Sequence, residues 1–223
     1  MPTLLVTGAN RGIGLEFVRQ YAADGWRVLA CARNPDRAHE LKSIQGDVRV
    51  HRLEVTDEQQ IAGLAAALKG EPIDILVNNA GVGGSDESTD PEDWLKTFRI
   101  NTIAPTRIAE AFLPNLEAGR GRTVLSLTSR MGSIADNTSG GSYSYRSSKA
   151  ALNAAMRSLA IDWKPRGIIV VVMHPGWVKT DMGGPDALIS PEHSVAGLRR
   201  KLASLKPGDS GGFFNYDGRV LPW

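Results

Sequence analysis

Cysteine is almost absent from this sequence, because Cys31 is the only one among its 223 residues. A single thiol excludes an intramolecular disulfide and a cysteine-based metal cluster, and we predict no metal site. The chain also lacks an apolar run of about 18 residues, which a membrane-spanning helix needs. Its first residues contain no basic region followed by a hydrophobic stretch, the mark of a secretory signal. We therefore expect a cytoplasmic protein that does not enter a membrane.

An excess of charge of either sign is missing as well. The chain has 26 Lys and Arg residues against 24 Asp and Glu residues, and the two signs are interspersed. The lack of a basic stripe argues against a nucleic-acid partner, and the lack of a block of like charge argues against a disordered tail. Hydrophobic residues make up 42% and charged residues 22% of the chain, as in an ordinary globular protein. The length fits one domain, so we predict a single domain over residues 1–223.

Short apolar, β-branched runs alternate with helical patterns along the chain. Strands are expected at residues 3–7, 27–31, 48–53, 73–77, 123–127, 168–173 and 213–216. Helices are expected at residues 13–24, 35–43, 58–69, 91–117, 142–164 and 191–205. This alternation predicts right-handed βαβ crossovers and a mainly parallel sheet with helices on both faces. Within that sheet Cys31 is interpreted as a buried strand residue rather than a nucleophile.

A glycine-rich turn follows the first expected strand. Its glycines, Gly8, Gly12 and Gly14, have the spacing G-x-x-x-G-x-G. Gly8 permits a sharp turn, Gly12 lets the backbone approach a pyrophosphate, and Gly14 lets the new helix pack closely. The helix N-terminus supplies free N–H groups and the positive end of its dipole. Because the turn opens a βαβ array, we favour nucleotide binding; a purely structural turn is the alternative.

The end of the second expected strand indicates which nucleotide binds. In NAD-binding proteins a carboxylate about 20 residues after the glycines accepts hydrogen bonds from the ribose 2′-OH. Here Arg33 and Asn34 occupy that region, with no acid, and Arg11 lies inside the glycine-rich turn. Guanidinium groups bind phosphate oxygens in a bidentate manner. The pattern predicts NADP(H) rather than NAD(H), and the alternative is that both arginines are merely solvated.

Polar or small residues follow the later strands, at the edge where open α/β sheets bind ligands. They are Asn79, Ala80 and Gly81 after the fourth strand, Ser129 after the fifth, and Pro175, Gly176, Val178 and Thr180 after the sixth. His174 ends the sixth strand, and we interpret it as structural because Pro-Gly fixes the turn directly after it. After the third strand, Thr56 or Asp57 is expected to cap the next helix.

Asn101 lies within the expected helix 91–117, four residues before Pro105. Proline has no N–H, so it cannot satisfy the Asn101 carbonyl. We therefore expect a local kink with an ordered water.

Tyr145 and Lys149 lie four residues apart at the start of the expected helix 142–164, so they share one face of it. An unperturbed tyrosine has a pKa of about 10, but a positive charge within about 4–6 Å lowers it. A tyrosine shifted in this way is a usable general acid or base. Of the four tyrosines, only Tyr145 has a lysine four residues on. Taken alone, the pair is more simply read as the edge of an amphipathic helix.

Together these motifs resemble the classical short-chain dehydrogenases/reductases along the whole chain. A closer similarity, to sniffer-type carbonyl reductases and the bacterial C-factor group, is carried by residues 136–141, 143–149, 174–184 and 215–218. The resemblance implies a single α/β domain of the Rossmann type, doubly wound, with seven strands in the order 3-2-1-4-5-6-7. It also implies NADPH-dependent reduction of an aldehyde, ketone or quinone-like carbonyl to an alcohol, and the reverse oxidation uses the same residues.

The resemblance assigns roles to four catalytic residues. Tyr145 donates a proton to the carbonyl oxygen while the nicotinamide delivers hydride to the carbon, and Lys149 lowers the tyrosine pKa and binds the nicotinamide ribose. Ser129 polarises the carbonyl. Asn101 holds a water that links Lys149 to solvent. Ser133 is the alternative to Ser129, because it lies 12 residues before Tyr145, near the usual family spacing, whereas Ser129 lies 16 before.

The resemblance also implies a set of cofactor-binding residues. Thr180 and the Val178 backbone bind the nicotinamide carboxamide, and Glu54 takes the place of an acid that contacts adenine in many relatives. The full set is Gly8, Asn10, Arg11, Gly12, Ile13, Gly14, Arg33, Asn34, Glu54, Val55, Asn79, Ala80, Gly81, Tyr145, Lys149, Pro175, Gly176, Val178 and Thr180.

The expected partners are a small-molecule carbonyl or alcohol substrate and further copies of the chain. The family suggests a homodimer or homotetramer through the helices after the fourth and fifth strands. The short segment 181–190 predicts a small lid and an open substrate pocket. A dinucleotide-binding signalling or regulatory protein of the C-factor type, with little turnover, is the alternative function.

Overall fold

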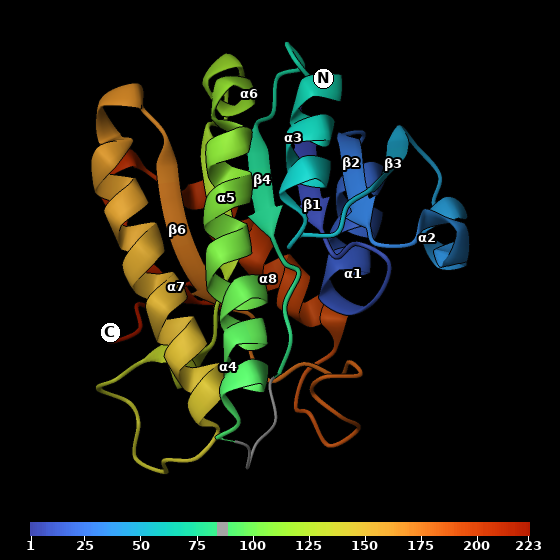
Figure 1. The fold of residues 1–223 in the computed structure, drawn as a ribbon. Helices are drawn as coiled ribbons and strands as arrows, with labels where there is room; N and C mark the ends of the chain where they lie inside the picture. Colours follow the sequence, from blue (N-terminus) through green and yellow to red (C-terminus); the bar gives the residue numbers. More distant parts are fainter. Residues whose placement is uncertain (84–88) are drawn as a thin grey trace.

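Seven strands form one sheet in the order β3-β2-β1-β4-β5-β6-β7, so the predicted topology is confirmed (Figure 1). The computed structural model describes residues 1–83 and 89–223. All six pairings between neighbouring strands are parallel. The strands are β1 (Thr3–Thr7), β2 (Arg27–Ala32), β3 (Val48–Arg52), β4 (Ile75–Asn78), β5 (Thr123–Leu127), β6 (Ile169–His174) and β7 (Phe213–Asn215). Their carboxyl ends therefore meet at one edge of the sheet.

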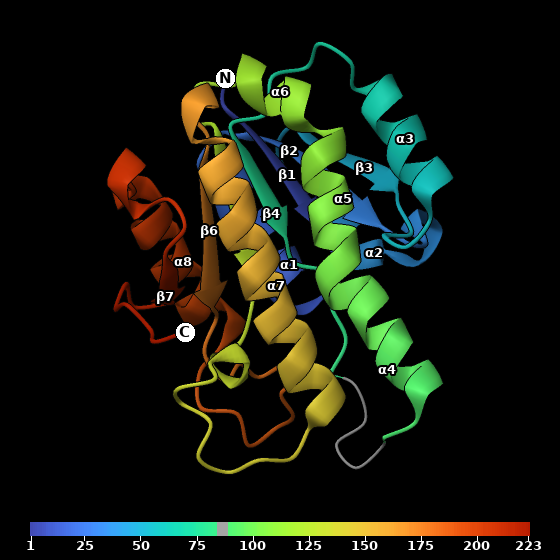
Figure 2. The same ribbon diagram turned by 60° about the vertical axis from the view of Figure 1, so that its left-hand side comes forward.

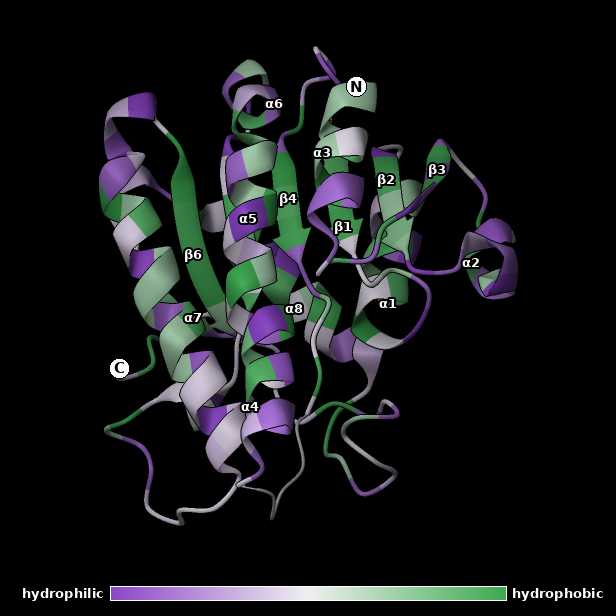
Figure 3. Ribbon diagram, viewed as in Figure 1, coloured by the Kyte–Doolittle hydropathy of each residue, from purple (hydrophilic) through white to green (hydrophobic). Residues whose placement is uncertain are grey.

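Helices cover both faces of the sheet, as predicted (Figure 2). One face is covered by α1 (Gly12–Ala23), α2 (His39–Lys42) and α8 (Pro191–Ser204), and the other by α3 (Glu58–Ala67), α5 (Ala104–Ala111), α6 (Leu113–Ala118) and α7 (Tyr143–Asp162). A separate apolar cluster fills each interface. The central strands are largely hydrophobic, because a sheet covered on both faces has no solvent side there (Figure 3). The edge strand β3 is more polar and only partly buried.

Cys31 is only 1% exposed within β2, so its interpretation as a buried strand residue is confirmed. Burial raises the pKa of its thiol to about 12. Such a thiol is not a nucleophile near neutral pH.

The long helix expected at residues 91–117 is divided into three α-helices and a π-helical turn. The segment consists of α4 (Pro91–Phe98), the π-helical turn (Arg99–Ile103), α5, and α6 after Phe112. The π turn directly precedes Pro105, where an ordinary helix would need the missing N–H. The chain therefore departs from a regular helix where a kink was expected, in the form of a widened turn. The ordered water stays a prediction.

The helix expected at residues 35–43 is wrong in extent. The chain forms a 3-10 turn (Pro35–Arg37) and then the four-residue α2, because Ala38 between them has φ −90° and ψ 59°, outside the helical region. The other expected boundaries differ from the structure by at most two residues. Asp57 caps α3, as predicted, since its side chain accepts hydrogen bonds from the main-chain N–H groups of Gln59 and Gln60.

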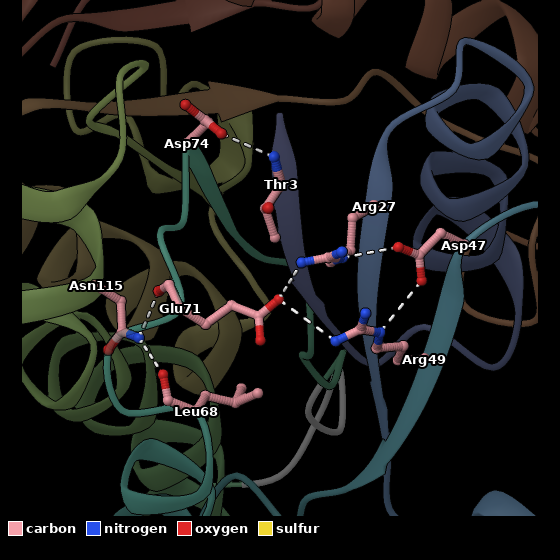
Figure 4. A network of polar contacts seen from close by, with 8 residues as sticks. All are labelled: Thr3, Arg27, Asp47, Arg49, Leu68, Glu71, Asp74 and Asn115. Atoms are coloured by element: carbon pink, nitrogen blue, oxygen red, sulfur yellow. Dashed lines mark hydrogen bonds and ion pairs between the residues drawn. The ribbon is translucent and has the colours of Figure 1, made fainter. Parts of the chain in front are cut away.

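A polar network ties the chain together at the edge where the strands begin (Figure 4). The buried Asp74 carboxylate accepts main-chain hydrogen bonds from Thr3 (2.7 Å), Arg120 (2.9 Å) and Gly121 (3.0 Å). Beside it Arg27 forms ion pairs with Asp47 and Glu71. This edge lies opposite the candidate site. In the part of the chain that the structure describes, no helix is long and apolar enough to cross a membrane.

Candidate active site

The glycine-rich turn joins β1 to α1 at the carboxyl edge of the sheet. Gly8 and Gly12 have φ of +63° and +55°, in the left-handed region that favours glycine. A Cβ on Gly14 would overlap the Gly8 carbonyl oxygen, so α1 packs too closely on the turn for any side chain there. Asn10 and Ile13 lie in the same turn. The first N–H groups of α1 consequently open toward this edge, as a phosphate-binding turn requires.

Asn79, after β4, supports this turn from the side. Its Nδ2 donates to the main-chain oxygens of Thr7 (2.8 Å) and Gly8 (3.0 Å). In return the Thr7 hydroxyl oxygen accepts hydrogen bonds from the N–H groups of Asn79 (3.0 Å) and Ala80 (3.1 Å). Thr7 is not among the predicted cofactor-binding residues, because a threonine at the end of a strand carries no local signal of function.

The residues predicted to bind the adenosine end lie around the ends of β2 and β3. Arg33 is exposed, and its guanidinium lies 3.9 Å from the Glu54 carboxylate. Glu54 also accepts hydrogen bonds from the N–H and hydroxyl of Thr56 (3.2 and 3.0 Å). Asn34 is exposed, whereas Val55 is buried. Arg33 and Asn34 are therefore free of packing that would prevent contact with a ligand.

The loop after β6 lies against the glycine-rich turn. A Cβ on Gly12 would lie 3.2 Å from the Thr180 methyl group, and Arg11 forms an ion pair with Asp181. The start of the loop is fixed by Gly176, whose φ is +87°. The Ser194 hydroxyl donates to the Pro175 carbonyl (2.6 Å). Two segments about 170 residues apart in sequence thus meet at the predicted dinucleotide site.

Within this loop Val178 is buried and Thr180 is held by its neighbours. The Thr180 hydroxyl donates to the Val178 carbonyl (3.3 Å) and accepts a hydrogen bond from the Gly183 N–H (3.2 Å). Exposed apolar side chains follow, with Trp177, Met182 and Leu188 each more than half exposed. The segment after β6 therefore presents an apolar surface beside the site.

Ser129, Tyr145 and Lys149 come together from β5 and α7. Ser129 follows β5, is 6% exposed and forms a side-chain hydrogen bond with Tyr145. Lys149 Nζ lies 5.8 Å from the centre of the Tyr145 ring and donates to the Leu127 carbonyl (2.9 Å). A Cβ on Gly81 would lie 3.7 Å from Lys149 Nζ, so the loop after β4 also reaches this point.

The pKa values of this group differ from the sequence expectation. Burial raises the pKa of the Tyr145 phenol, and the hydrogen bond with Ser129 lowers it in part. Burial also lowers the pKa of Lys149 to about 8, and the lysine does not offset the effect of burial on the phenol. The predicted lowering of the Tyr145 pKa by Lys149 is therefore wrong for the chain by itself.

Asn101, in the π turn, is completely buried and links three elements. Its Oδ1 accepts a hydrogen bond from the Val82 N–H (2.9 Å), and its Nδ2 donates to the Val82 carbonyl (2.9 Å) and to the Ser148 hydroxyl (3.1 Å). The side chain thus joins the loop after β4 to α7 next to Lys149. Ser148 is not among the predicted site residues, because its position relative to Tyr145 and Lys149 matches no motif in the sequence.

Ser133 and His174, the two other residues considered in the sequence, have surroundings that indicate a structural role. The Ser133 hydroxyl, 1% exposed, donates to the Trp223 carbonyl (2.9 Å). His174 ends β6 with its Nδ1 buried and unpartnered among the described residues. Burial, and then the positive charge of Arg130, lowers the pKa of His174 to about 4, so it is neutral near pH 7.

A sequence model of the short chain dehydrogenase family matches residues 2–187 of this chain. The chain belongs to the short-chain dehydrogenase family. Its Rossmann fold and the order of its strands are those of that family. Members of the family bind nicotinamide dinucleotides and are oxidoreductases.

Three relatives place this short-chain dehydrogenase more closely. The C-signal protein of Myxococcus xanthus is 50% identical over 155 residues, which cover 68% of this chain and 93% of that protein. The carbonyl reductase Sniffer of D. melanogaster has a TM-score of 0.93 and 34% identity, over 100% of both chains. The NADPH-bound carbonyl reductase from chicken fatty liver has a TM-score of 0.93 and 37% identity, over 100% of this chain and 99% of that one. The similarity to sniffer-type reductases and to the C-factor group is thereby confirmed.

Proposed function

We propose that this short-chain dehydrogenase reduces an aldehyde, ketone or quinone-like carbonyl to an alcohol with NADPH. The observation that carries the proposal is the convergence of Ser129, Tyr145, Lys149 and Asn101 at the carboxyl edge of the sheet. The carbonyl reductase activity named for two structural relatives supports the same reaction.

The residues divide the work at the carbonyl between them. NADPH, when bound, supplies the hydride. Tyr145, which remains protonated near neutral pH because burial raises its pKa, donates its phenolic proton to the carbonyl oxygen. The Ser129 hydroxyl, already hydrogen-bonded to that phenol, stabilises the negative charge that develops on the same oxygen. Lys149, whose Nζ lies 5.8 Å from the centre of the Tyr145 ring, would hold a ribose hydroxyl of the bound dinucleotide.

The glycine-rich turn and its surroundings fit the dinucleotide. Gly8 and Gly12 give the turn its left-handed backbone, and Gly14 lets α1 begin directly against it, so that the first N–H groups of α1 are available to a pyrophosphate. Arg11 and Arg33 are both exposed and suit the 2′-phosphate that distinguishes NADPH from NADH. Each arginine lies beside a carboxylate, Asp181 and Glu54 respectively, which a phosphate would replace or share.

A second candidate function, dinucleotide-dependent signalling with little turnover, is favoured by the 50% identity to the C-signal protein. Proteins that lose catalysis usually lose part of the constellation. Here Asn101, Ser129, Tyr145 and Lys149 are all present, so we place reduction first.

Oxidation of NADPH and of NADH in the presence of aldehydes, dicarbonyls and quinones tests the proposal. We expect turnover with NADPH in preference to NADH. Tyr145→Phe should lower kcat by about 10²-fold or more, the usual contribution of a general acid. Tyr143→Phe is the matched control, because Tyr143 is exposed on the same helix and should keep full activity.

Full turnover by Tyr145→Phe would overturn the proposed mechanism. Intact NADPH binding without turnover of any carbonyl would favour the signalling role instead.

A further inference from the structure

The loop that follows Ser129, here named the serine loop (residues 130–136), is packed at its beginning against α7. The Ser129 hydroxyl oxygen accepts a hydrogen bond from the Met131 N–H (3.1 Å), and the Gly132 N–H donates to the Ser129 carbonyl (2.9 Å). A Cβ on Gly132 would lie 2.8 Å from the Lys149 carbonyl carbon, so the loop touches the helix backbone itself. The position of Ser129 therefore depends on the path of this loop.

The second half of the serine loop is held by the last residue of the sequence. The carbonyl oxygen of Trp223 accepts hydrogen bonds from the Ser133 hydroxyl (2.9 Å) and from the Ala135 N–H (2.9 Å). The Ser133 oxygen also accepts a hydrogen bond from the Asp136 N–H (3.1 Å). One main-chain oxygen of Trp223 thus holds both Ser133 and Ala135.

Trp223 is in turn anchored on the sheet. Residues 216–223, named the return segment, fold back along β7: the Leu221 N–H donates to the Phe213 carbonyl (2.8 Å), and the Asn215 N–H donates to the Arg219 carbonyl (2.8 Å). The Trp223 ring lies 5.5 Å from the Phe213 ring, measured between centres. Phe213 is 1% exposed and belongs to the apolar cluster beneath α7. A continuous path of contacts therefore runs from the core, through Trp223 and the serine loop, to Ser129.

We propose that Trp223 is a positioning residue for carbonyl reduction, because its ring is seated on Phe213 while its carbonyl fixes the serine loop and so places Ser129 beside Tyr145. This inference rests on the proposed function. It also gives the buried Ser133 hydroxyl a structural role, as the contact between the loop and the return segment. A misplacement of about 1 Å at a catalytic group costs up to about 10²-fold in rate, so loss of this anchor should be measurable.

Four variants separate the parts of the anchor. Deletion of Trp223 removes the ring and the main-chain oxygen, and Trp223→Ala removes the ring alone. Ser133→Ala removes the hydroxyl contact with Trp223 together with the contact from the Asp136 N–H. Trp223→Phe keeps an aromatic ring on Phe213 and is the conservative control. Val220→Ala, at a position 75% exposed in the return segment, is the second control.

For each variant, kcat and KM for a carbonyl substrate, the Kd for NADPH, and amide hydrogen exchange of residues 130–136 are measured. Deletion should lower kcat by about tenfold, Ser133→Ala should lower it by about threefold, and Trp223→Phe should restore most of it. Exchange in residues 133–136 should become faster as kcat falls. The Kd for NADPH should stay within about twofold, because none of the residues proposed to bind the dinucleotide lies in the serine loop or the return segment.

Several outcomes would overturn the inference. One is a deletion that leaves kcat and loop exchange unchanged; another is a fall in NADPH affinity parallel to the fall in kcat, which indicates general loosening. If the deletion variant does not fold, Ser133→Ala alone decides, and an unchanged kcat there rejects the role. A further loss of kcat when Ser133→Ala is added to the deletion would show that Ser133 acts directly on the substrate.

Failure of the proposed function would look different. Wild-type protein that turned over no carbonyl would reject carbonyl reduction, whereas the exchange of residues 133–136 would still decide whether Trp223 holds the serine loop.

Discussion

Lys149 shows how much one buried side chain determines at this site. It is 6% exposed, and its Nζ is hydrogen-bonded to the Leu127 carbonyl (2.9 Å). Because burial removes the hydration of the ammonium group, the pKa of Lys149 falls to about 8. The site therefore holds a lysine that changes its charge within reach of physiological pH, beside a tyrosine whose pKa is raised.

The Lys149 pKa has a consequence for stability. Since the folded-state pKa of about 8 is lower than the unfolded value of 10.5, the unfolded chain binds more protons between these two pH values. The free energy of unfolding contributed by Lys149 should therefore rise with pH across this window, by about 3 kcal/mol in total. Urea unfolding of wild type and Lys149→Met at pH 7.5 and pH 10 measures this contribution. Between the two pH values the free energy of unfolding of the wild-type protein should rise relative to that of the variant. A difference that does not depend on pH would contradict this.

At the scale of the element, the interrupted helix is the feature that shapes the site. The π turn (Arg99–Ile103) brings the Asn101 side chain inward between the loop after β4 and α7. A regular helix rises uniformly and turns by a fixed angle per residue, so the extra residue in the π turn shifts the face on which Asn101 lies. The distortion and the contact with Ser148 are thus two results of one local change.

Asn101→Ala should lower the free energy of unfolding by about 2–4 kcal/mol. The substitution leaves the partly buried N–H and carbonyl of Val82 without their partner, and a polar group that loses its partner away from water costs about 1–3 kcal/mol. Chemical denaturation measures the loss. Gln59→Ala, on an exposed face of α3, is the control and should change stability by less than about 0.5 kcal/mol. Equal free energies of unfolding for the two variants would contradict the proposed structural role of Asn101.

At the scale of the whole molecule, the carboxyl edge of the sheet forms the candidate site and the amino edge contributes to stability. The candidate site lies where the strands end, whereas the network around Asp74, Arg27 and Glu71 lies where they begin (Figure 4). Asp74 joins the start of β1 to the segment between α6 and β5. This edge contributes to stability without touching the site.

Asp74→Ala separates stability from activity. It removes the acceptor for three main-chain N–H groups, which should cost about 3 kcal/mol. In a chain of this size that loss lowers Tm by about 6–12 °C. Well below the new Tm, kcat and the Kd for NADPH should equal the wild-type values. Calorimetry and kinetics on the same sample test this, and a folded variant with weakened NADPH binding would show that the two edges are coupled.

Association through α4, α5 and α7 into a homodimer or homotetramer stays a prediction, as does a cytoplasmic location. Leu95, Ile103 and Ile161 on these helices are more than half exposed, which suits such an interface. Sedimentation of the purified chain tests the oligomeric state.

The sequence by itself determined the parallel sheet and the loops at its carboxyl edge, because apolar strand runs, glycine spacing and the i, i+4 pair are local signals. The order of the strands came from the resemblance to the family, and the structure has that order. Pro105 was the sequence feature that indicated an irregular helix at the position of the π turn. Only the tertiary structure decided the rest: that Thr7 supports the glycine-rich turn, that Lys149 is buried enough to lower its own pKa, and that Trp223 reaches Ser133. The physical reason is that desolvation and these hydrogen bonds arise between residues far apart in the chain, where no spacing in the sequence records them.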